Sequence, residues 1–94
     1  MNLRNEARGR ACMGRYPGVC NFDTSTTVLA HLRLAGITGG AQKAPDQLGA
    51  WLCSASHDET DRRTRKLESD FVKTMFYEAI FRTQYELIKE GAIK

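Results

Sequence analysis

The sequence predicts an α+β fold in which a small β-hairpin runs directly into a helix and packs on a long C-terminal helix. Two short apolar runs, residues 28–34 and 48–53, have the length and content of strands. A polar segment with capping residues follows the second run, and apolar residues then recur at helical spacing from 70 to 90. A short N-terminal helix and a cysteine-containing loop precede the hairpin. The 94 residues are enough for a single domain, 1–94, with a thin core.

A long glycine-rich loop is expected between the two strands. VLAHLRL, residues 28–34, combines β-branched residues with leucines, and LGAWLC, residues 48–53, is a second apolar run. AGITGGAQKAPD, residues 35–46, contains three glycines and a proline, which disfavour regular structure. Lys43 follows these glycines, but their spacing is not that of a P-loop, so a flexible connection is the simpler interpretation. The length of the loop suggests function or mobility.

Two helices are expected to flank the hairpin. Residues 2–9 predict a short helix that ends at Gly9, and residues 10–27 predict irregular structure with a turn at Pro17 and Gly18. After the second strand, a serine at 54 or 56 caps a helix that runs through HDETDRRTRK, with acidic residues in its first turn and basic residues in its last.

The C-terminal helix is the clearest element of the sequence. It is expected from residue 70 to residue 90, and Gly91 is a natural stop. Its apolar stripe could bind a partner, but little apolar material lies elsewhere, so the stripe is expected to form the main wall of the core. The stripe consists of Phe71, Val72, Met75, Phe76, Ala79, Ile80, Thr83, Leu87 and Ile88.

Composition places the chain among soluble globular proteins. Hydrophobic residues make up 41% and charged residues 27% of the sequence. No apolar run approaches the roughly 20 residues that span a bilayer, so no membrane association is expected. The first ten residues, MNLRNEARGR, lack the apolar core of a secretory signal. A cytoplasmic location is therefore expected, and three cysteines in a reducing compartment do not suggest a disulfide framework.

The net charge of +3 lies in the first part of the chain. Residues 57–94 carry eight basic and eight acidic side chains, whereas residues 1–56 carry six basic against three acidic. Four of those six are arginines within the first fifteen positions. A basic patch of this kind suits a phosphate backbone. On charge alone, a solvated surface is the preferred interpretation.

Three cysteines have the arrangement of a structural zinc site that lacks one ligand. Cys12 and Cys20 lie in one turn-containing loop, and Cys53 ends the second strand. Ser56 stands where a second cysteine would complete C-x-x-C, and a serine hydroxyl is a poor zinc ligand. A water molecule, Ser56 or a nearby histidine would then be the fourth ligand. The alternative is that the cysteines are small buried apolar side chains.

The two histidines are the other residues suited to chemistry. His31 lies in the first predicted strand, with Arg33 two residues later on the same face. His57 opens the helix after the hairpin, and Asp61 follows one turn later on the same face. An imidazole and a carboxylate at this spacing can hold one side of a divalent cation. A structural role for each histidine is about equally probable on the pattern alone.

These segments together resemble the HNH (ββα-metal) nucleases, and more narrowly the small phage and prophage nucleases of the YbcO type. The resemblance rests on a cysteine pair, a strand carrying A-H-L-R, a loop ending K-x-P-D, and L-C-x-x-S-H opening a helix. It covers nearly the whole chain through ARGRAC, PGVCN, LAHLRLAG, CSASHDETDRRT and the tail segments RTQ and KEGAIK.

The resemblance implies a ββα-metal finger and a role for each matched residue. His31 matches the general base that activates the attacking water, and His57 matches a ligand of the catalytic divalent metal, such as Mg²⁺ or Mn²⁺. Asp46 stands nearest the central asparagine that orients the base. Asp61 stands where related sequences often carry a further histidine, and Arg33 would clamp a phosphate oxygen. Cys12, Cys20 and Cys53 match structural zinc ligands.

The sequence also departs from the family pattern. Ala30 stands where many such nucleases place a second metal ligand, Ser56 replaces the fourth cysteine, and the central asparagine is absent. The expected function is a metal-dependent endonuclease that acts on double- or single-stranded DNA. One alternative is a non-catalytic nucleic-acid-binding module with a degenerate site. Another is an accessory protein that docks a phage partner, or a host recombination or replication protein, through the C-terminal helix.

Overall fold

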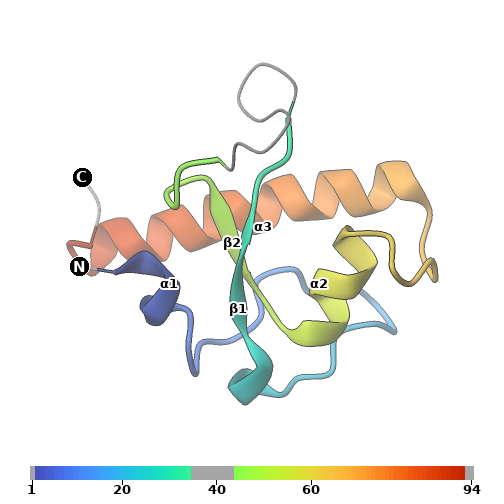
Figure 1. Ribbon diagram of the computed structural model, residues 1–94, viewed down its shortest axis with the longest axis horizontal. Coiled ribbons are helices and arrows are strands. Elements are labelled where there is room, and N and C mark those ends of the chain that lie inside the picture. Colours follow the sequence, from blue (N-terminus) through green and yellow to red (C-terminus); the bar gives the residue numbers. More distant parts are fainter. Residues whose placement is uncertain (1, 35–43, 93–94) are drawn as a thin grey trace.

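Two four-residue strands form the antiparallel hairpin at the centre of the computed structural model, which describes residues 2–34 and 44–92 (Figure 1). Strand β1 is Val28–His31 and strand β2 is Gly49–Leu52, so both are shorter than the apolar runs that predict them. The register pairs Val28 with Leu52 and His31 with Gly49. A Cβ atom on Gly49 would lie 3.0 Å from the backbone Ala30 O and 2.8 Å from Leu29 Cδ1, so a side chain here would be tightly packed against β1. Of the loop expected at 35–46, residues 35–43, Lys43 included, lie outside the described part.

The hairpin is covered on both faces, because side chains alternate along each strand. Ala30, Ala50 and Leu52 pack against the long helix α3 (Ser69–Lys89). Leu29 and Trp51 point the other way and pack against the short helix α1 (Leu3–Glu6) and the last turn of α3. A third cluster, made by Tyr16, Val19 and Val72, holds the cysteine-containing loop against the start of α3. All four residues of β2 are buried.

Helix α3 runs the length of the molecule and forms the main wall of the core, as predicted (Figure 1). The prediction is wrong for two members of the stripe, which do not lie in the core. Phe71 is 41% exposed and Ile88 is 54% exposed. Both lie toward the outward side of the helix, because only about a third of its circumference contacts the hairpin. Gly91 ends the helix with φ +77°, and Ala92 N–H donates to Leu87 O, which is a Schellman-type stop.

Helix α2 (Ser54–Thr60) follows the hairpin directly, but its cap and its length differ from the prediction. The N-cap is Cys53, whose Sγ accepts a hydrogen bond from Ser56 N–H, so neither serine caps the helix. The helix ends before the basic run at 62–66, because Arg62 adopts a left-handed conformation with φ +63°. The first helical turn therefore begins at the cysteine itself.

The first part of the chain is irregular apart from two short helices. Asn2 caps α1 through its side chain, and the 3₁₀ turn η1 (Thr24–Thr26) is capped in the same way by Asp23. The helix predicted over 2–9 is thus reduced to one turn. The molecule is a small α+β fold with a two-stranded antiparallel hairpin and helices. Among the described residues, no helix has both the length and the apolar content that crossing a membrane requires.

Candidate functional site

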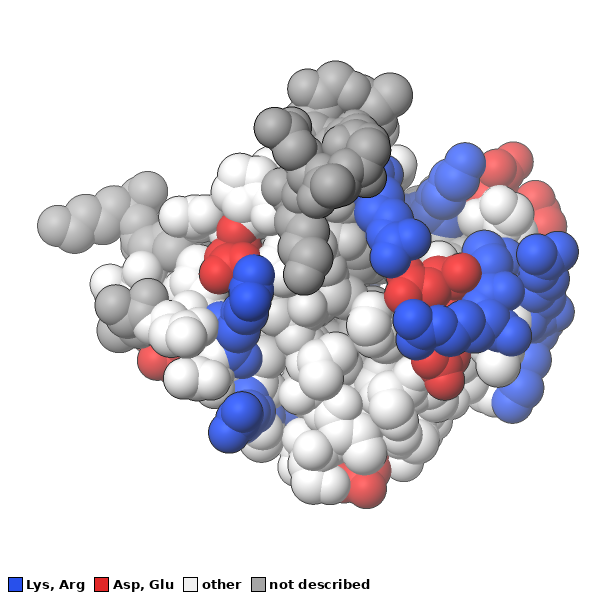
Figure 2. All heavy atoms as spheres, viewed as in Figure 1, with Lys and Arg blue, Asp and Glu red and all other residues white. Residues whose placement is uncertain are grey.

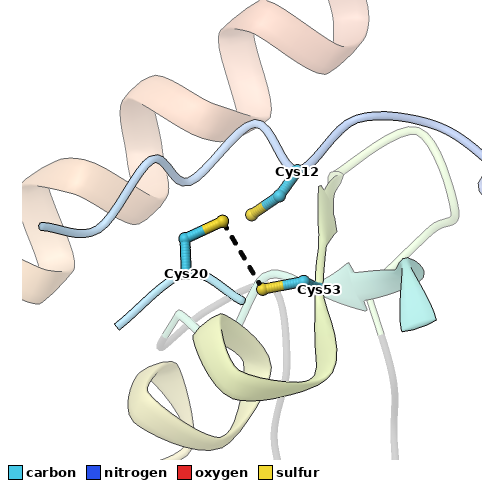
Figure 3. A group of neighbouring side chains, drawn as sticks. All are labelled: Cys12, Cys20 and Cys53. Atoms are coloured by element: carbon cyan, nitrogen blue, oxygen red, sulfur yellow. Dashed lines mark hydrogen bonds between the residues drawn. The ribbon is translucent and has the colours of Figure 1, made fainter. Parts of the chain in front are cut away.

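The structure brings Cys12, Cys20 and Cys53 together from two parts of the chain (Figure 3). Their sulfur atoms all lie within 4.8 Å of one another, and Cys20 Sγ is 3.8 Å from Cys53 Sγ. Cys12 and Cys20 come from the loop before β1, and Cys53 comes from the junction between β2 and α2. The three cysteines are close enough to hold one metal ion.

Ser56 completes this cluster from the first turn of α2. Its Oγ lies 3.2 Å from Cys53 Sγ and 3.5 Å from Cys12 Sγ, and the residue is fully buried. Around a tetrahedral zinc with bonds of about 2.3 Å, neighbouring sulfurs stand about 3.8 Å apart. The Cys20–Cys53 separation equals that spacing, and all three sulfurs lie within 4.8 Å of one another, so the cluster could hold a metal ion on three sulfurs with Ser56 Oγ beside it.

The surroundings of the cluster affect the pKa values of Cys53 and Cys20 in opposite directions. Burial opposes ionisation of Cys53, but hydrogen bonds from the Ser56 hydroxyl and from the backbone N–H groups of Asn21 and Ser56 outweigh it and lower the pKa of Cys53 to about 7. Burial, opposed by the backbone N–H of Phe22 and assisted by the neighbouring cysteines, raises the pKa of Cys20 to about 11. The surroundings thus favour the thiolate of Cys53 over that of Cys20, and thiolate is the form that binds a metal.

A second group of side chains lies at the open end of β1. His31 Nε2 and Asp46 Oδ1 are 2.7 Å apart, and Arg4 Nε lies 3.5 Å from the same oxygen. The hydrogen bond from His31, opposed by partial burial and assisted by Arg4, holds the pKa of Asp46 below its ordinary value. A carboxylate only accepts hydrogen bonds, so the bond to Asp46 places a proton on His31 Nε2.

His57 and Asp61 form a third group on α2 and its C-cap. His57 Nε2 lies 3.3 Å from Asp61 Oδ2, as expected for residues one turn apart. Asp61 is largely buried, and its carboxylate is shared with Arg33 at 3.7 Å and Arg63 at 3.9 Å. In this arrangement two cations and an imidazole surround one carboxylate.

A groove of about 250 Å³ is lined by one member each of the second and third groups, His31 and Asp61, whereas His57 and Asp46 are not among its lining residues. His31 and Arg33 line it from the end of β1, and Asp61 lines it from the end of α2. The far wall is α3, which contributes Lys73 and Tyr77. The sequence-predicted residues His31, Arg33 and Asp61 therefore face a common space, with Asp46 bonded to His31 behind it.

Ala30, by contrast, does not face this space. It is 2% exposed and packs with Ala50 and residues of α3 on the opposite side of the strand from His31. A metal ligand at this position would point into the core. The alanine at position 30, where many such nucleases have a metal ligand, is therefore part of the contact between the hairpin and α3.

The sequence of the chain matches one protein family over almost its whole length. Residues 1–92 fit the family described as "Putative nuclease YbcO". The chain belongs to the YbcO family. Two curated YbcO relatives, one named "Putative nuclease YbcO" from Escherichia coli (strain K12) and one named "Putative nuclease ybcO" from Enterobacteria phage 82, are each 48% identical to it over 93 residues. That region is 99% of this chain and 97% of each relative.

A solved structure agrees with this membership of the YbcO family. It is described as "Structure of a putative bacteriophage protein from Escherichia coli str. K-12 substr. MG1655". Its sequence is 43% identical to this chain, and the superposition covers 96% of this chain and all of that one with a TM-score of 0.82. The small α+β fold expected from the sequence is thereby confirmed.

Sequence reasoning missed several residues at these sites. Lys73 and Tyr77 lie more than 40 positions after His31, and no local pattern links them to it. Asn21 donates from its side chain to Ser54 Oγ at 3.1 Å and so ties the cysteine loop to α2. Glu59 is fully buried beneath the end of α2. Its place among charged and polar neighbours on a polar helix predicts an exposed residue, so the sequence carries no signal of its burial.

Proposed function

We propose that the chain is a metal-dependent endonuclease that hydrolyses DNA phosphodiester bonds at an HNH-type site on the β1–β2–α2 unit. The observation that carries the proposal is the His31–Asp46 pair, held at 2.7 Å beside a groove that Asp61 and Arg33 also line. The family name of the relatives supports a nuclease. The order strand, strand, helix supports the ββα-metal type of finger.

His31 acts as the general base in this proposal. Asp46 accepts from Nε2–H and holds the ring in the tautomer that leaves Nδ1 able to take a proton from the attacking water. The carboxylate also stabilises the imidazolium that this step forms, as the acid of a catalytic triad does. Asp46 therefore takes over the orienting task of the motif's asparagine, through its side chain.

His57 and Asp61 would hold the catalytic divalent cation, such as Mg²⁺ or Mn²⁺. Mg²⁺ is commonly bound by one or two carboxylates, with water and substrate phosphate completing its coordination, so Asp61 would supply the carboxylate and His57 one nitrogen ligand. A bound cation would stabilise the charge that develops on the phosphate and on the leaving oxygen. Arg33, which already lies 3.7 Å from Asp61, binds a phosphate oxygen beside it.

Zinc at Cys12, Cys20 and Cys53 has a structural role in the proposal. The cluster joins the loop before β1 to the start of α2, the helix that carries His57. A zinc ion bound there would hold α2 against the hairpin. Ser56 or a water molecule would supply the fourth ligand.

The second candidate is a DNA-binding module of the same fold that does not cleave. It is favoured by the ion pairs that Arg33 and Arg63 make with Asp61, and by the placement of Ala30 in the core. Both features reduce the ligands offered to a catalytic metal. DNA is the partner in either case.

Cleavage of plasmid and single-stranded DNA in Mg²⁺ or Mn²⁺ tests the proposal. The wild type is expected to cut, and His31→Ala is expected to lose about 100-fold or more in rate, the usual contribution of a general base. Asp46→Asn keeps an oxygen acceptor for Nε2–H but loses the charge, so it is expected to retain more activity than His31→Ala. Lys89→Ala, at the far end of α3, is the control that should cut normally.

An NMR titration of the His57 ring with Mg²⁺ or Mn²⁺ separates the two candidates. A metal-dependent shift together with cleavage supports the endonuclease. A folded, zinc-loaded wild type that neither cuts nor shows a shift at His57 would rule out the endonuclease and favour the binding module.

A further inference from the structure

Three cations reach the groove from three different elements. Arg33 follows β1, Arg62 follows α2, and Lys73 lies in the second turn of α3. Asp61 is the one carboxylate among the groove's described lining residues, so basic groups outnumber acidic ones there. Figure 2 shows the basic side chains gathered over α2 and the segment that leads to α3, with acidic side chains among them. The groove is therefore suited to a chain of phosphates.

Lys73 is the cation best placed to bind a ligand. Arg33 is shared with Asp61, and Arg62 interacts with the Glu59 carboxylate at 3.5 Å and with Leu67 O at 3.0 Å. No ion pair or hydrogen bond joins the Lys73 side chain to another described residue. Binding a phosphate at Lys73 would therefore break no internal contact seen in the described part of the chain.

Exposed aromatic rings continue from the groove along α3. Tyr77 lines the groove and is 38% exposed, and Phe81, four residues later on the same face, is 69% exposed. The helical rise separates these positions by about 6 Å. The next ring on this face, Tyr85, already has a cation on it, because Lys89 Nζ lies 4.8 Å from its centroid. Two exposed rings thus directly follow the cationic groove, and the Tyr77 ring also lies 6.5 Å from the ring of Phe76, tilted against it.

We propose that the groove and the adjoining face of α3 bind single-stranded DNA. Arg33, Arg62 and Lys73 hold successive phosphates, while Tyr77 and Phe81 stack on unpaired bases. This inference rests on the proposed function and extends it to the form of the substrate. A cationic groove beside exposed rings is the usual design of a single-strand site, because rings stack only on bases that are not already paired.

A second copy of the chain is a less suitable occupant of this face. A symmetric antiparallel contact centred on Phe81 would set Lys73, eight residues before it, opposite Lys89, eight residues after it. A parallel contact would set each lysine opposite itself. Both arrangements bring like charges together at the edge of the stripe, which opposes association. A nucleic acid, by contrast, brings the opposite charge.

Fluorescence anisotropy with a labelled 20-nucleotide oligothymidine and a duplex of equal length tests the inference. The full-length, zinc-loaded protein is used without added Mg²⁺ or Mn²⁺. The single strand is expected to bind more tightly than the duplex. Lys73→Ala should weaken binding and reduce the slope of log K against log salt by about 0.7, the value for one phosphate contact on a single strand.

Variants of the rings test the stacking. Tyr77→Ala and Phe81→Ala should each weaken single-strand binding about fivefold or more, the lower end of the effect of losing one stacked base. Tyr77→Phe keeps a ring and should bind as the wild type does. Lys89→Ala and Ile88→Ala are matched controls on the same helix and should have little effect. Thermal melts verify that each variant is folded.

Three results would overturn the inference: equal or tighter binding of the duplex, unchanged binding by the Lys73, Tyr77 and Phe81 variants, or a dimer in solution that Phe81→Ala dissociates. The outcome is separable from that of the proposed function. DNA cleavage with no effect of these variants would reject the single-strand site alone. Single-strand binding with the expected pattern but no cleavage would reject the endonuclease alone.

Discussion

Ser56 shows how a single side chain determines the character of the cysteine cluster. Its hydroxyl lies within 3.5 Å of two cysteine sulfurs at a fully buried position, where a fourth sulfur would complete a tetrahedral site. Zinc prefers thiolate to a neutral hydroxyl, so the oxygen at this place weakens the site without distorting it. A cysteine at position 56 would place its sulfur close to where the Ser56 hydroxyl lies now.

Restoring that sulfur is therefore expected to strengthen metal binding. Ser56→Cys should raise the zinc affinity at least roughly tenfold, equivalent to about 1.4 kcal/mol. Competition with a chromophoric chelator measures the change. Ser54→Cys, which adds a thiol at an exposed position of the same helical turn, is the control and should leave the affinity near that of the wild type. Equal gains in both variants would show that the added thiol acts without occupying the fourth position.

Glu59 organises the connection between α2 and α3. Its buried carboxylate accepts from Thr64 Oγ1 at 2.6 Å and from Leu67 N–H at 2.8 Å, and Arg62 lies 3.5 Å away. Burial raises the pKa of Glu59, but these hydrogen bonds outweigh it and hold the pKa below its ordinary value. The turn that places Arg62 at the groove is thus built around a buried anion.

Removing this charge is expected to loosen the turn. In Glu59→Gln one amide oxygen must replace two carboxylate oxygens, which should cost about 1–3 kcal/mol, the usual range for a buried polar group left without its partner. Urea unfolding measures the loss. Glu78→Gln removes an exposed partner of Arg82 on α3 and should change stability little. A loss of similar size in the two variants would contradict the structural role of Glu59.

Arg10 joins the first and last helices. Its guanidinium stacks 4.6 Å from the Trp51 ring centroid and makes a two-pronged pair with the Glu90 carboxylate at the end of α3. Glu6 of α1 lies 3.2 Å away. Arg10→Ala should lower the free energy of unfolding by about 1 kcal/mol through loss of the Trp51 contact. Arg10→Lys should recover little of this stability, because an ammonium cannot make the two-pronged pair with Glu90. Arg63→Ala, exposed, is the control for thermal melts.

The same pair predicts a dependence on pH. The hydrogen bond from Arg10, opposed by slight burial, holds the pKa of Glu90 below its ordinary value in the folded state. Its contribution to stability is therefore present above the ordinary pKa of glutamate and is lost as the pH falls through the lowered folded value. The melting temperatures of the wild type and of Glu90→Gln should approach each other as the pH is lowered. A difference that persists in acid would contradict this assignment.

At the scale of the whole molecule, the core is divided among three small clusters. The loop that carries Cys12 and Cys20 has little regular structure and is held by a few contacts. Met13 N–H donates to Trp51 O of β2 at 2.7 Å, Arg82 of α3 donates to Met13 O at 2.9 Å, and Tyr16 and Val19 pack against the start of α3. A domain of this size buries only about two-thirds of its unfolded surface. A metal ion bound by these cysteines would add a further tie between this loop and α2 and would contribute to folding.

Removal of zinc is accordingly expected to destabilise the whole chain. A strong chelator should lower the melting temperature by more than about 10 °C, since each 1 kcal/mol shifts it by about 4–8 °C in a domain of this size. Added Zn²⁺ should restore the transition. A protein that contains no zinc by elemental analysis and melts identically with and without chelator would exclude a structural metal.

The sequence by itself determined the order of elements and part of the site. Helical spacing predicted α3, two apolar runs predicted the hairpin, and cysteine spacing predicted a cluster with Ser56 in the fourth place. His57 and Asp61 are neighbours because they are one helical turn apart. These features are local, so the residues within a short window carry the information that produces them.

The tertiary structure alone decided which distant residues meet. Asp46 reaches His31 and Arg4 only because the hairpin register and α1 bring the three together, and Lys73 and Tyr77 line the groove only because α3 crosses the hairpin beside it. The crossing also buries Glu59 and Ala30 and leaves Phe71 and Ile88 outside. Such contacts depend on how whole elements pack, and no short stretch of sequence encodes the position of a helix that lies forty residues away.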